Sequence, residues 1–185
     1  DGAPVEPGDA VTVIDSGGRF GGRGFFNPPP ALCCRILTRQ DEPIDAAFFA
    51  RRVAGAAALR PSGETLGRLV WSEADGLPGL VVDRYADVVA LQCLTLGMVR
   101  VRGALVAALR GTLGDLAIFS VDDSVAAGLE GFAPERGWVD RVGPDTVVVD
   151  EDGVKLRVTL GVGHKTGLYL DQRVNHRRVT ESAAG

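Results

Sequence analysis

The residues best suited to chemistry gather in one stretch near the C-terminal end, residues 161–173. It contains three glycines together with Lys165, one of only two lysines, and His164, one of only two histidines. Glycine lets a ligand or another backbone approach closely. A glycine run that leads into a helix start suits a charged ligand, because the first backbone N–H groups of a helix attract anions. The stretch therefore predicts a site that handles a charged ligand.

A phosphate-binding P-loop is the first alternative for this stretch. That motif requires the pattern G-x-x-x-x-G-K-[ST]. Here His164 stands directly before Lys165, and Thr159 stands five residues before His164, so both required glycines are replaced. The sequence therefore argues against a P-loop nucleotide hydrolase.

Three ordered motifs instead resemble one family. Residues 164–173 read His-Lys-Thr-Gly-Leu-Tyr-Leu-Asp-Gln-Arg. They closely resemble the signature just ahead of the catalytic domain in S-adenosylmethionine-dependent 23S rRNA 5-methylcytosine methyltransferases. Two further stretches resemble that family at the same relative places, Arg-Phe-Gly-Gly-Arg-Gly-Phe-Phe-Asn-Pro at 19–28 and Asp-Gly-Leu-Pro-Gly-Leu-Val-Val-Asp-Arg-Tyr at 75–85. The resemblance covers the chain from about Pro7 onward.

The resemblance implies an α+β fold with three parts. Residues 1–61 are expected to form an incomplete PUA-like β-barrel that binds RNA, with a connecting helix. Residues 62–160 are expected to form a mixed α/β central domain and a β-hairpin, and residues 161–185 the signature linker and first helix of a Rossmann-like methyltransferase domain. In the family a glycine-rich cofactor strand comes next. We therefore expect a front half that lacks the catalytic domain and a short N-terminal stretch, with no activity and no tight S-adenosylmethionine binding of its own.

Local patterning predicts the secondary structure of these parts. Strands are expected over residues 10–15, 19–26 and 32–38, followed by a helix over 43–60. Further strands are expected over 66–71, 80–83, 88–94 and 117–121, a helix over 98–113, and a hairpin over 146–149 and 154–160. Alternating apolar residues indicate the strands, and an i, i+4 apolar spacing indicates the helices. Asp171 is the predicted N-cap of a final helix. Asp122 and Asp123 depart from the family, whose members tend to carry basic residues there.

Composition and charge limit the class of protein. No apolar run approaches the roughly 18 residues that a membrane span requires, and the N-terminus shows no signal pattern. Cys33, Cys34 and Cys93 form no C-x-x-C pair, which predicts buried, reduced thiols in a cytoplasmic protein. The net charge of −4 argues against a strong nucleic-acid binder, yet residues 15–60 carry seven arginines and only four acidic residues. Phosphate contacts need such local charge rather than a basic chain.

Candidate contacts follow from this charge and from the resemblance. PUA domains bind RNA, so Arg19 and Arg23 are candidate phosphate contacts, with solvated surface arginines as the equal alternative. The resemblance also implies that the signature lines the pocket of the methyl donor, S-adenosylmethionine. There Gln172 can hold the donor's amino-acid end or ribose. Tyr169 offers a ring face to the sulfonium cation. Lys165 suits an RNA phosphate or the donor carboxylate, and Arg173 is a further RNA candidate.

The chain offers no catalytic or metal-binding set of its own. The three cysteines match no catalytic cysteine of the family, and His164 and His176 lack companions at metal-ligand spacing. We predict the N-terminal and central portion of an rRNA (cytosine-5) methyltransferase that positions ribosomal RNA, with no membrane partner. The alternative is a PUA-containing RNA-binding module without chemistry. A coding region that continues past Gly185 would favour the enzyme; whether the chain forms a homodimer is left open.

Overall fold

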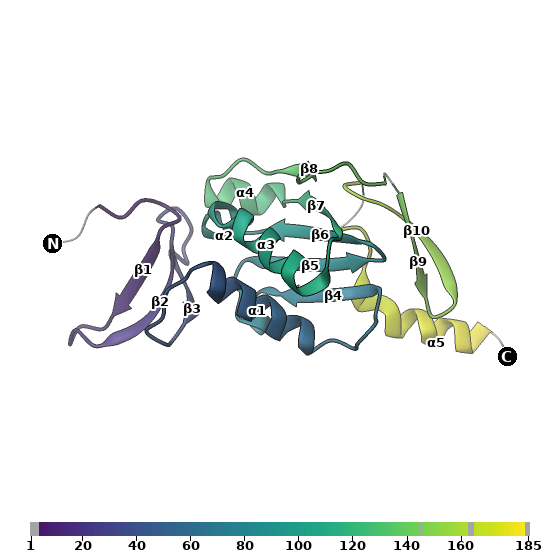
Figure 1. The fold of residues 1–185 in the computed structure, drawn as a ribbon, viewed down its shortest axis with the longest axis horizontal. Helices are drawn as coiled ribbons and strands as arrows, with labels where there is room; N and C mark the ends of the chain where they lie inside the picture. The colour runs from purple at the N-terminus through teal and green to yellow at the C-terminus, as the bar shows by residue number, and fades with distance from the viewer. Residues whose placement is uncertain (1–3, 145, 163–164, 184–185) are drawn as a thin grey trace.

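The computed structural model describes residues 4–144, 146–162 and 165–183. Figure 1 shows a small N-terminal sheet at one end and a larger central sheet with helices. A hairpin and the last helix lie at the opposite end. The mixed α/β character expected from the sequence is confirmed, whereas the barrel and the domain boundaries at residues 61 and 160 stay predictions.

The N-terminal sheet has three antiparallel strands, β1 (Ala10–Ile14), β2 (Phe20–Phe26) and β3 (Cys34–Thr38), in the order β1-β2-β3. The register shifts between Val13 and Ile14 and again between Arg23 and Gly24. Such irregularities are typical of β-bulges, which glycines in a strand favour. A Cβ atom at Gly24 would lie 2.0 Å from the carbonyl oxygen of Arg35, so this position requires glycine.

The central sheet has the order β4-β5-β6-β7-β8. Its strands are β4 (Leu66–Trp71), β5 (Leu80–Tyr85), β6 (Val88–Cys93), β7 (Ala117–Val121) and β8 (Arg136–Trp138). All neighbours are antiparallel except β6 and β7, which are parallel and therefore need a crossover. That crossover is made by α2 (Leu96–Arg100) and α3 (Arg102–Leu113). The short strand β8 was not predicted.

Two predicted helix bounds are wrong, each for a local reason. Helix α1 (Ala46–Ala58) begins after Asp45, whose Oδ1 accepts a hydrogen bond from the Phe48 amide at 2.8 Å, so the helix does not start at Pro43. Asp45 is thus an N-cap rather than a first-turn residue. The helix predicted over 98–113 is divided at Val101, and its first part starts earlier, capped by Thr95.

The central sheet is covered on both faces. Phe48, Phe49 and Val53 of α1 and Leu105 of α3 belong to one core cluster, which also includes apolar residues of β5 and β6. The other cluster joins Tyr85, Val88 and Phe119 of the sheet to the C-terminal hairpin. Burial on both faces explains why β5 and β6 carry near-continuous apolar runs instead of alternating ones.

The C-terminal hairpin consists of β9 (Thr146–Glu151) and β10 (Val154–Thr159). Asp152 and Gly153 connect them with φ of 53° and 89°, which confirms the predicted turn. A short 3₁₀ turn, η2 (Leu170–Gln172), then leads into α5 (Arg173–Ala183). Asp171 lies inside η2 and makes no side-chain cap, so its predicted N-cap role is wrong.

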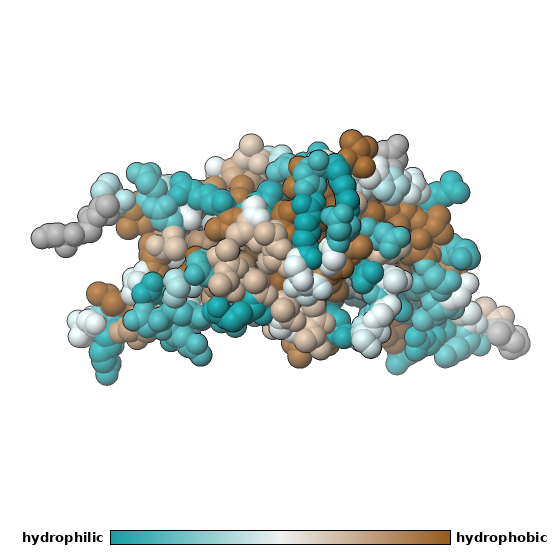
Figure 2. All heavy atoms as spheres, viewed as in Figure 1, coloured by the Kyte–Doolittle hydropathy of each residue, from teal (hydrophilic) through white to brown (hydrophobic). Residues whose placement is uncertain are grey.

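The surface shown in Figure 2 mixes hydrophilic and hydrophobic residues. Among the residues that the structure describes, no helix is long and apolar enough to cross a membrane.

Candidate functional site

A buried carboxylate, Asp83, lies where the signature stretch meets the central sheet. Asp83 is fully buried on β5, directly opposite Arg68 on β4. The Arg68 guanidinium donates two hydrogen bonds to it, Nε to Oδ1 at 2.7 Å and Nη2 to Oδ2 at 2.9 Å. Burial acts to lower the pKa of Arg68, but the hydrogen bond to Asp83 and the charge of that carboxylate together outweigh burial, so the pKa is raised. The pair is therefore charged and fixed in a bidentate geometry.

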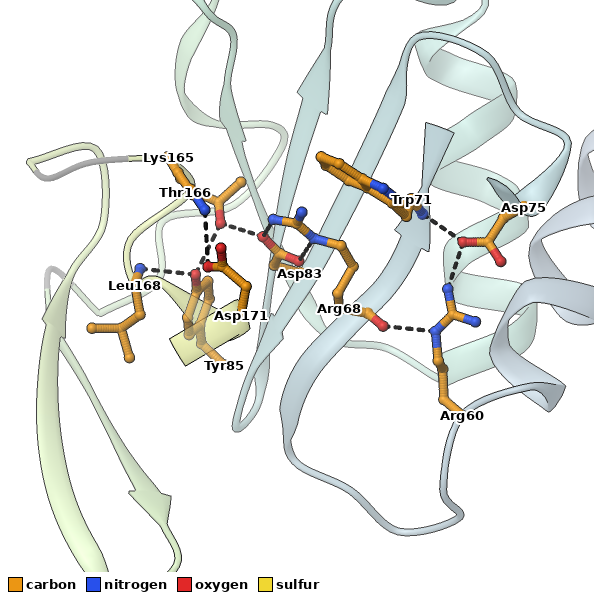
Figure 3. A network of polar contacts seen from close by, with 10 residues as sticks. All are labelled: Arg60, Arg68, Trp71, Asp75, Asp83, Tyr85, Lys165, Thr166, Leu168 and Asp171. Carbon is orange, nitrogen blue, oxygen red and sulfur yellow. Dashed lines mark hydrogen bonds and ion pairs between the residues drawn. The ribbon is translucent and has the colours of Figure 1, made fainter. Parts of the chain in front are cut away.

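Thr166 connects the signature to this pair, as Figure 3 shows. Its hydroxyl Oγ1 donates to Oδ2 of Asp83. Because that hydroxyl has a single hydrogen, the contact of 2.9 Å between Tyr85 Oη and Thr166 Oγ1 must be donated by Tyr85. The Leu168 amide donates in turn to Tyr85 Oη at 3.1 Å. A directional chain of hydrogen bonds thus runs from the signature backbone to a buried carboxylate.

The signature packs closely against the central sheet at Thr166 and Gly167. Thr166 is only 1% exposed. Gly167 has a φ of 157°, and a Cβ atom there would lie 2.8 Å from Val158 and 3.3 Å from the Tyr85 ring. A larger residue would therefore push the signature away from the sheet. Burial, followed by the charge of Asp83, raises the pKa of Tyr85 and keeps its hydroxyl protonated as a donor.

The exposed side of the signature carries a second, local cluster. The Lys165 ammonium pairs with Oδ1 of Asp171 at 2.9 Å and lies 4.7 Å from the centre of the Tyr169 ring. The hydrogen bond from Lys165 lowers the pKa of Asp171. The structure therefore brings two predicted donor contacts, Lys165 and Tyr169, together with Asp171. Of the signature, Gly163 and His164 lie outside the described residues.

Gln172 and Arg173 are held by neighbouring residues. Gln172 Oε1 accepts a hydrogen bond from Asn175 at 2.7 Å. Arg173 Nη1 donates to Glu64 Oε1 at 2.5 Å and to the carbonyl oxygen of Leu66 at 3.2 Å. The hydrogen bond from Arg173 to Glu64 raises the pKa of the guanidinium. Arg173, a predicted RNA contact, thus fastens the start of α5 to the strand that carries Arg68.

The two arginines predicted to contact RNA in the N-terminal sheet lie away from the signature, at the other end of the molecule (Figure 1). Arg19 pairs with Asp15 at 2.8 Å, with 86% of its side chain exposed. Arg23 pairs with Asp41 at 2.5 Å and is less exposed. Each guanidinium therefore has an acidic neighbour that a phosphate would have to displace or share.

A further buried carboxylate, Glu130, joins the N-terminal sheet to the central part. Glu130 accepts hydrogen bonds from Asn27 Nδ2 at 2.8 Å, from Arg35 at 3.2 Å and from the Leu96 amide at 3.1 Å. Asn27 belongs to the first family motif, which ends beside this joint. The motif thus has a structural contact that spans about a hundred residues of sequence.

The two aspartates that depart from the family have structural roles. Asp122 is buried and accepts hydrogen bonds from the Cys93 amide at 2.9 Å and from Arg102 at 2.6 Å. Asp123 caps α4 (Ser124–Glu130) through a hydrogen bond from the Ala126 amide at 2.8 Å. Asp123 is therefore explained by a local cap, and Asp122 by contacts with Cys93 and Arg102, which lie 29 and 20 residues earlier in the chain.

Sequence reasoning assigned no role to four residues of the site, Arg68, Asp83, Tyr85 and Thr166, although the last three lie within the family motifs. The signal that could have found Asp83 is a charged residue inside the apolar run Leu-Val-Val-Asp of β5, because buried carboxylates need partners. Its partner Arg68 sits on a neighbouring strand, and Thr166 lies 83 residues further along the chain. Only the folded structure connects them.

Several known proteins are similar to this chain. Residues 1–39 match a family described as a PUA-like domain. The chain is 40% identical over 181 residues to ribosomal RNA large subunit methyltransferase I of Shewanella denitrificans. The aligned region covers 94% of this chain and 46% of that protein. The corresponding protein of Shewanella frigidimarina is 37% identical over 191 residues, which cover 100% of this chain and 48% of that protein. The chain thus spans about half the length of the curated relatives it matches.

A solved structure shows the same fold. The structure of SMU.776 in complex with SAH superposes with a TM-score of 0.79 and 17% sequence identity. The match covers 94% of this chain and 45% of that one. By sequence the chain is similar to ribosomal RNA large subunit methyltransferase I, and residues 1–39 match a PUA-like domain. Among the described residues, no group of three or more His, Cys, Asp or Glu side chains could hold a metal ion.

The thiols differ in exposure from what the sequence predicted. All three are free, but only Cys93 is buried; Cys33 is exposed and Cys34 is half-buried. The prediction of buried thiols is wrong for Cys33, which lies just before β3 in the connection after the proline run.

Proposed function

We propose that this chain is the N-terminal and central portion of an S-adenosylmethionine-dependent methyltransferase that modifies a cytosine at C5 in 23S ribosomal RNA. Its role would be to grip the RNA and to position it for methyl transfer in the cytoplasm. The observation that carries the proposal is the 40% identity to a ribosomal RNA large subunit methyltransferase I along 94% of the chain. A likeness of that length extends beyond the PUA-like residues 1–39 and includes the signature.

The docked signature supports this proposal. A segment that only linked two domains would need few buried polar contacts. Here Thr166 and Tyr85 fix the signature to Asp83 inside the central sheet. The central part would thus set the position at which a following methyltransferase domain begins.

The exposed cluster of the signature has chemistry that fits a methyl donor. Lys165 can pair with the donor carboxylate, Asp171 can accept from its amino group, and Tyr169 is 44% exposed. We propose that Lys165, Tyr169 and Gln172 contact the donor. S-adenosylmethionine would supply the methyl group when bound. The Lys165 ammonium already lies over the Tyr169 ring, so it would have to move if that ring is to face a sulfonium cation.

RNA binding by this chain tests the proposal. A 23S ribosomal RNA fragment should be retained on filters by the chain at low salt, with affinity that falls as salt rises because counterions are released. We propose Arg19, Arg23, Lys165 and Arg173 as phosphate contacts. Arg23→Ala should reduce the salt slope by about one unit if Arg23 neutralises one phosphate. The matched control is Arg141→Ala, which removes another ion-paired arginine from the connection between β8 and β9.

One result would contradict the proposal, and another would contradict only the role of Arg23. Absence of RNA retention at low salt would remove the positioning role. An unchanged slope in Arg23→Ala, equal to that of Arg141→Ala, would return Arg23 to ordinary solvated surface while leaving RNA binding itself intact.

A further inference from the structure

Trp71 is an exposed aromatic side chain at the end of β4, an edge strand of the central sheet. Half of its surface, 50%, is accessible to solvent. The other tryptophan, Trp138, packs edge-on against Phe119 with ring centroids 5.1 Å apart. Single exposed apolar residues are common on protein surfaces. Exposure alone therefore does not indicate a binding role for Trp71. The evidence for such a role comes from the residues that hold Trp71 in place.

One face of the Trp71 ring is backed by a fixed cation. The guanidinium carbon of Arg68 lies 4.3 Å from the ring centroid. Arg68 is itself held by two hydrogen bonds to the fully buried Asp83. Figure 3 shows the indole beside the guanidinium, with Asp83 on the side toward the signature. The support under the ring is thus rigid, because a bidentate pair fixes the guanidinium plane.

The backbone of Trp71 is fixed by a second carboxylate. Its amide donates to Oδ2 of Asp75 at 2.5 Å, and Arg60 Nη2 donates to the same oxygen at 2.5 Å. Arg60 Nε also donates to the carbonyl oxygen of Arg68 at 2.8 Å. Buried ion pairs contribute little net stability compared with apolar side chains of similar volume. A contribution to stability therefore does not by itself explain why two such ion pairs hold the exposed ring of Trp71.

The charges around Trp71 are balanced. Arg60 is paired with Asp75, and Arg68 with Asp83. This surface offers no excess of positive charge for a phosphate backbone. It offers a flat ring with a cation behind it, and an indole Nε1–H that has no acceptor among the described residues. Such a surface fits the face of an unpaired base, since proteins recognise single-stranded RNA by stacking bases on aromatic and guanidinium planes.

We propose that Trp71, backed by Arg68, is a stacking platform for an unpaired nucleobase of single-stranded RNA. This inference rests on the proposed function, because it names a further contact for the same RNA. Through Asp83 and Thr166 the platform is joined to the signature. A base stacked on Trp71 would lie beside the point where the methyltransferase domain is proposed to begin.

Tryptophan fluorescence can test the platform directly. The variant Trp138→Phe leaves Trp71 as the single tryptophan. Titration with a single-stranded oligoribonucleotide of about 12 residues, a length within the usual site size, should quench its emission to saturation. The same sugar-phosphate chain without bases should not quench it. In anisotropy with labelled RNA, Trp71→Ala should weaken binding about tenfold, within the range expected for the loss of one stacked base.

Two further variants serve as controls for the role of the Trp71 ring. Trp71→Phe keeps an aromatic face and should retain most of the affinity, whereas Leu129→Ala removes an exposed apolar side chain from α4 and should change nothing. Melting temperatures of all variants exclude loss of folding as the cause. RNA binding without quenching, together with Trp71→Ala within twofold of the parent, would overturn the platform and leave the proposed function standing. Absence of RNA binding at low salt would overturn both.

Discussion

Replacing Thr166 by valine should destabilise the docked signature strongly, although the two side chains have nearly the same shape. The change removes the hydroxyl that donates to Asp83 and accepts from Tyr85. A hydrogen bond to a charged group contributes about 1.5–3 kcal/mol and a neutral one about 0.5–1.5 kcal/mol. Asp83 keeps its two bonds from Arg68, so the free energy of unfolding should fall by roughly 2–4 kcal/mol.

Thermal unfolding followed by circular dichroism measures this loss. For a chain of this size each kcal/mol corresponds to about 2–4 °C, so the melting temperature should fall by roughly 5–15 °C. Thr166→Ser keeps a hydroxyl at this position, so its melting temperature should lie close to that of the parent. The matched control is Thr180→Val on α5, where the exposed hydroxyl donates only to the His176 carbonyl oxygen. That substitution should stay within about 0.5 kcal/mol of the parent.

A double-mutant cycle with Tyr85→Phe isolates the contact between the two hydroxyls. Because Tyr85 donates to Thr166, the two substitutions should be less than additive, with a coupling of about 0.5–1.5 kcal/mol. The reasoning is refuted if Thr166→Val melts within about 2 °C of the parent, or if the two substitutions are additive. Either result would mean that the signature is held by apolar packing of residues such as Leu168 and Leu170.

Three further predictions concern the buried Glu130 and the cysteines. Glu130→Ala should raise amide hydrogen exchange throughout the N-terminal sheet, because Arg35 and the Leu96 amide lose their acceptor and Asn27 keeps only the backbone carbonyl oxygen of residue 130, at a cost of about 3–5 kcal/mol. Glu73→Ala, which removes a largely exposed carboxylate from the same surface, should leave exchange unchanged. Burial raises the pKa of Cys93 to about 12 from an ordinary 9.0. Its stabilising contribution is therefore complete below pH 9 and is lost as pH rises toward 12, so the unfolding free energy of Cys93→Ala should depend less steeply on alkaline pH. In the native protein a thiol reagent should modify Cys33 first and Cys93 only on unfolding, and rapid labelling of Cys93 would contradict the burial.

Short-range chemistry explains which elements could be predicted from the sequence. The turn at Asp152 and Gly153 needs positive φ at both residues, which glycine and aspartate tolerate. The buried face of α1 follows from the spacing of Phe48, Phe49 and Val53. Two helix bounds were predicted wrongly because local hydrogen bonding decides where a helix begins. Helix α1 begins after its cap Asp45 rather than at Pro43, and the helix predicted over 98–113 is divided at Val101.

The candidate site was predicted only in part. Its location in the signature came from the sequence, because glycines, Lys165 and Tyr169 stand close together there. The bonds that hold it did not, because Asp83 is 83 residues from Thr166 and Glu64 is 109 residues from Arg173. A charged residue in an apolar strand indicates that it pairs with another side chain in the folded protein. It does not identify that side chain, because the chain contains many arginines that could pair with a carboxylate.

The sequence by itself determined the elements and the place of the signature, because turns, caps and apolar periodicity act between residues a few positions apart. Only the tertiary structure decided what each polar side chain does. Arg19 and Arg23, predicted as phosphate contacts or equally as solvated surface arginines, have acidic neighbours, and Asp171 pairs with Lys165 instead of capping a helix. The long-range contacts of Asp83 with Arg68 and Thr166, by contrast, depend on the register of β4 and β5 and on the packing of the signature against the sheet. Those arrangements are set by burial of the whole sheet, which no short stretch of sequence contains.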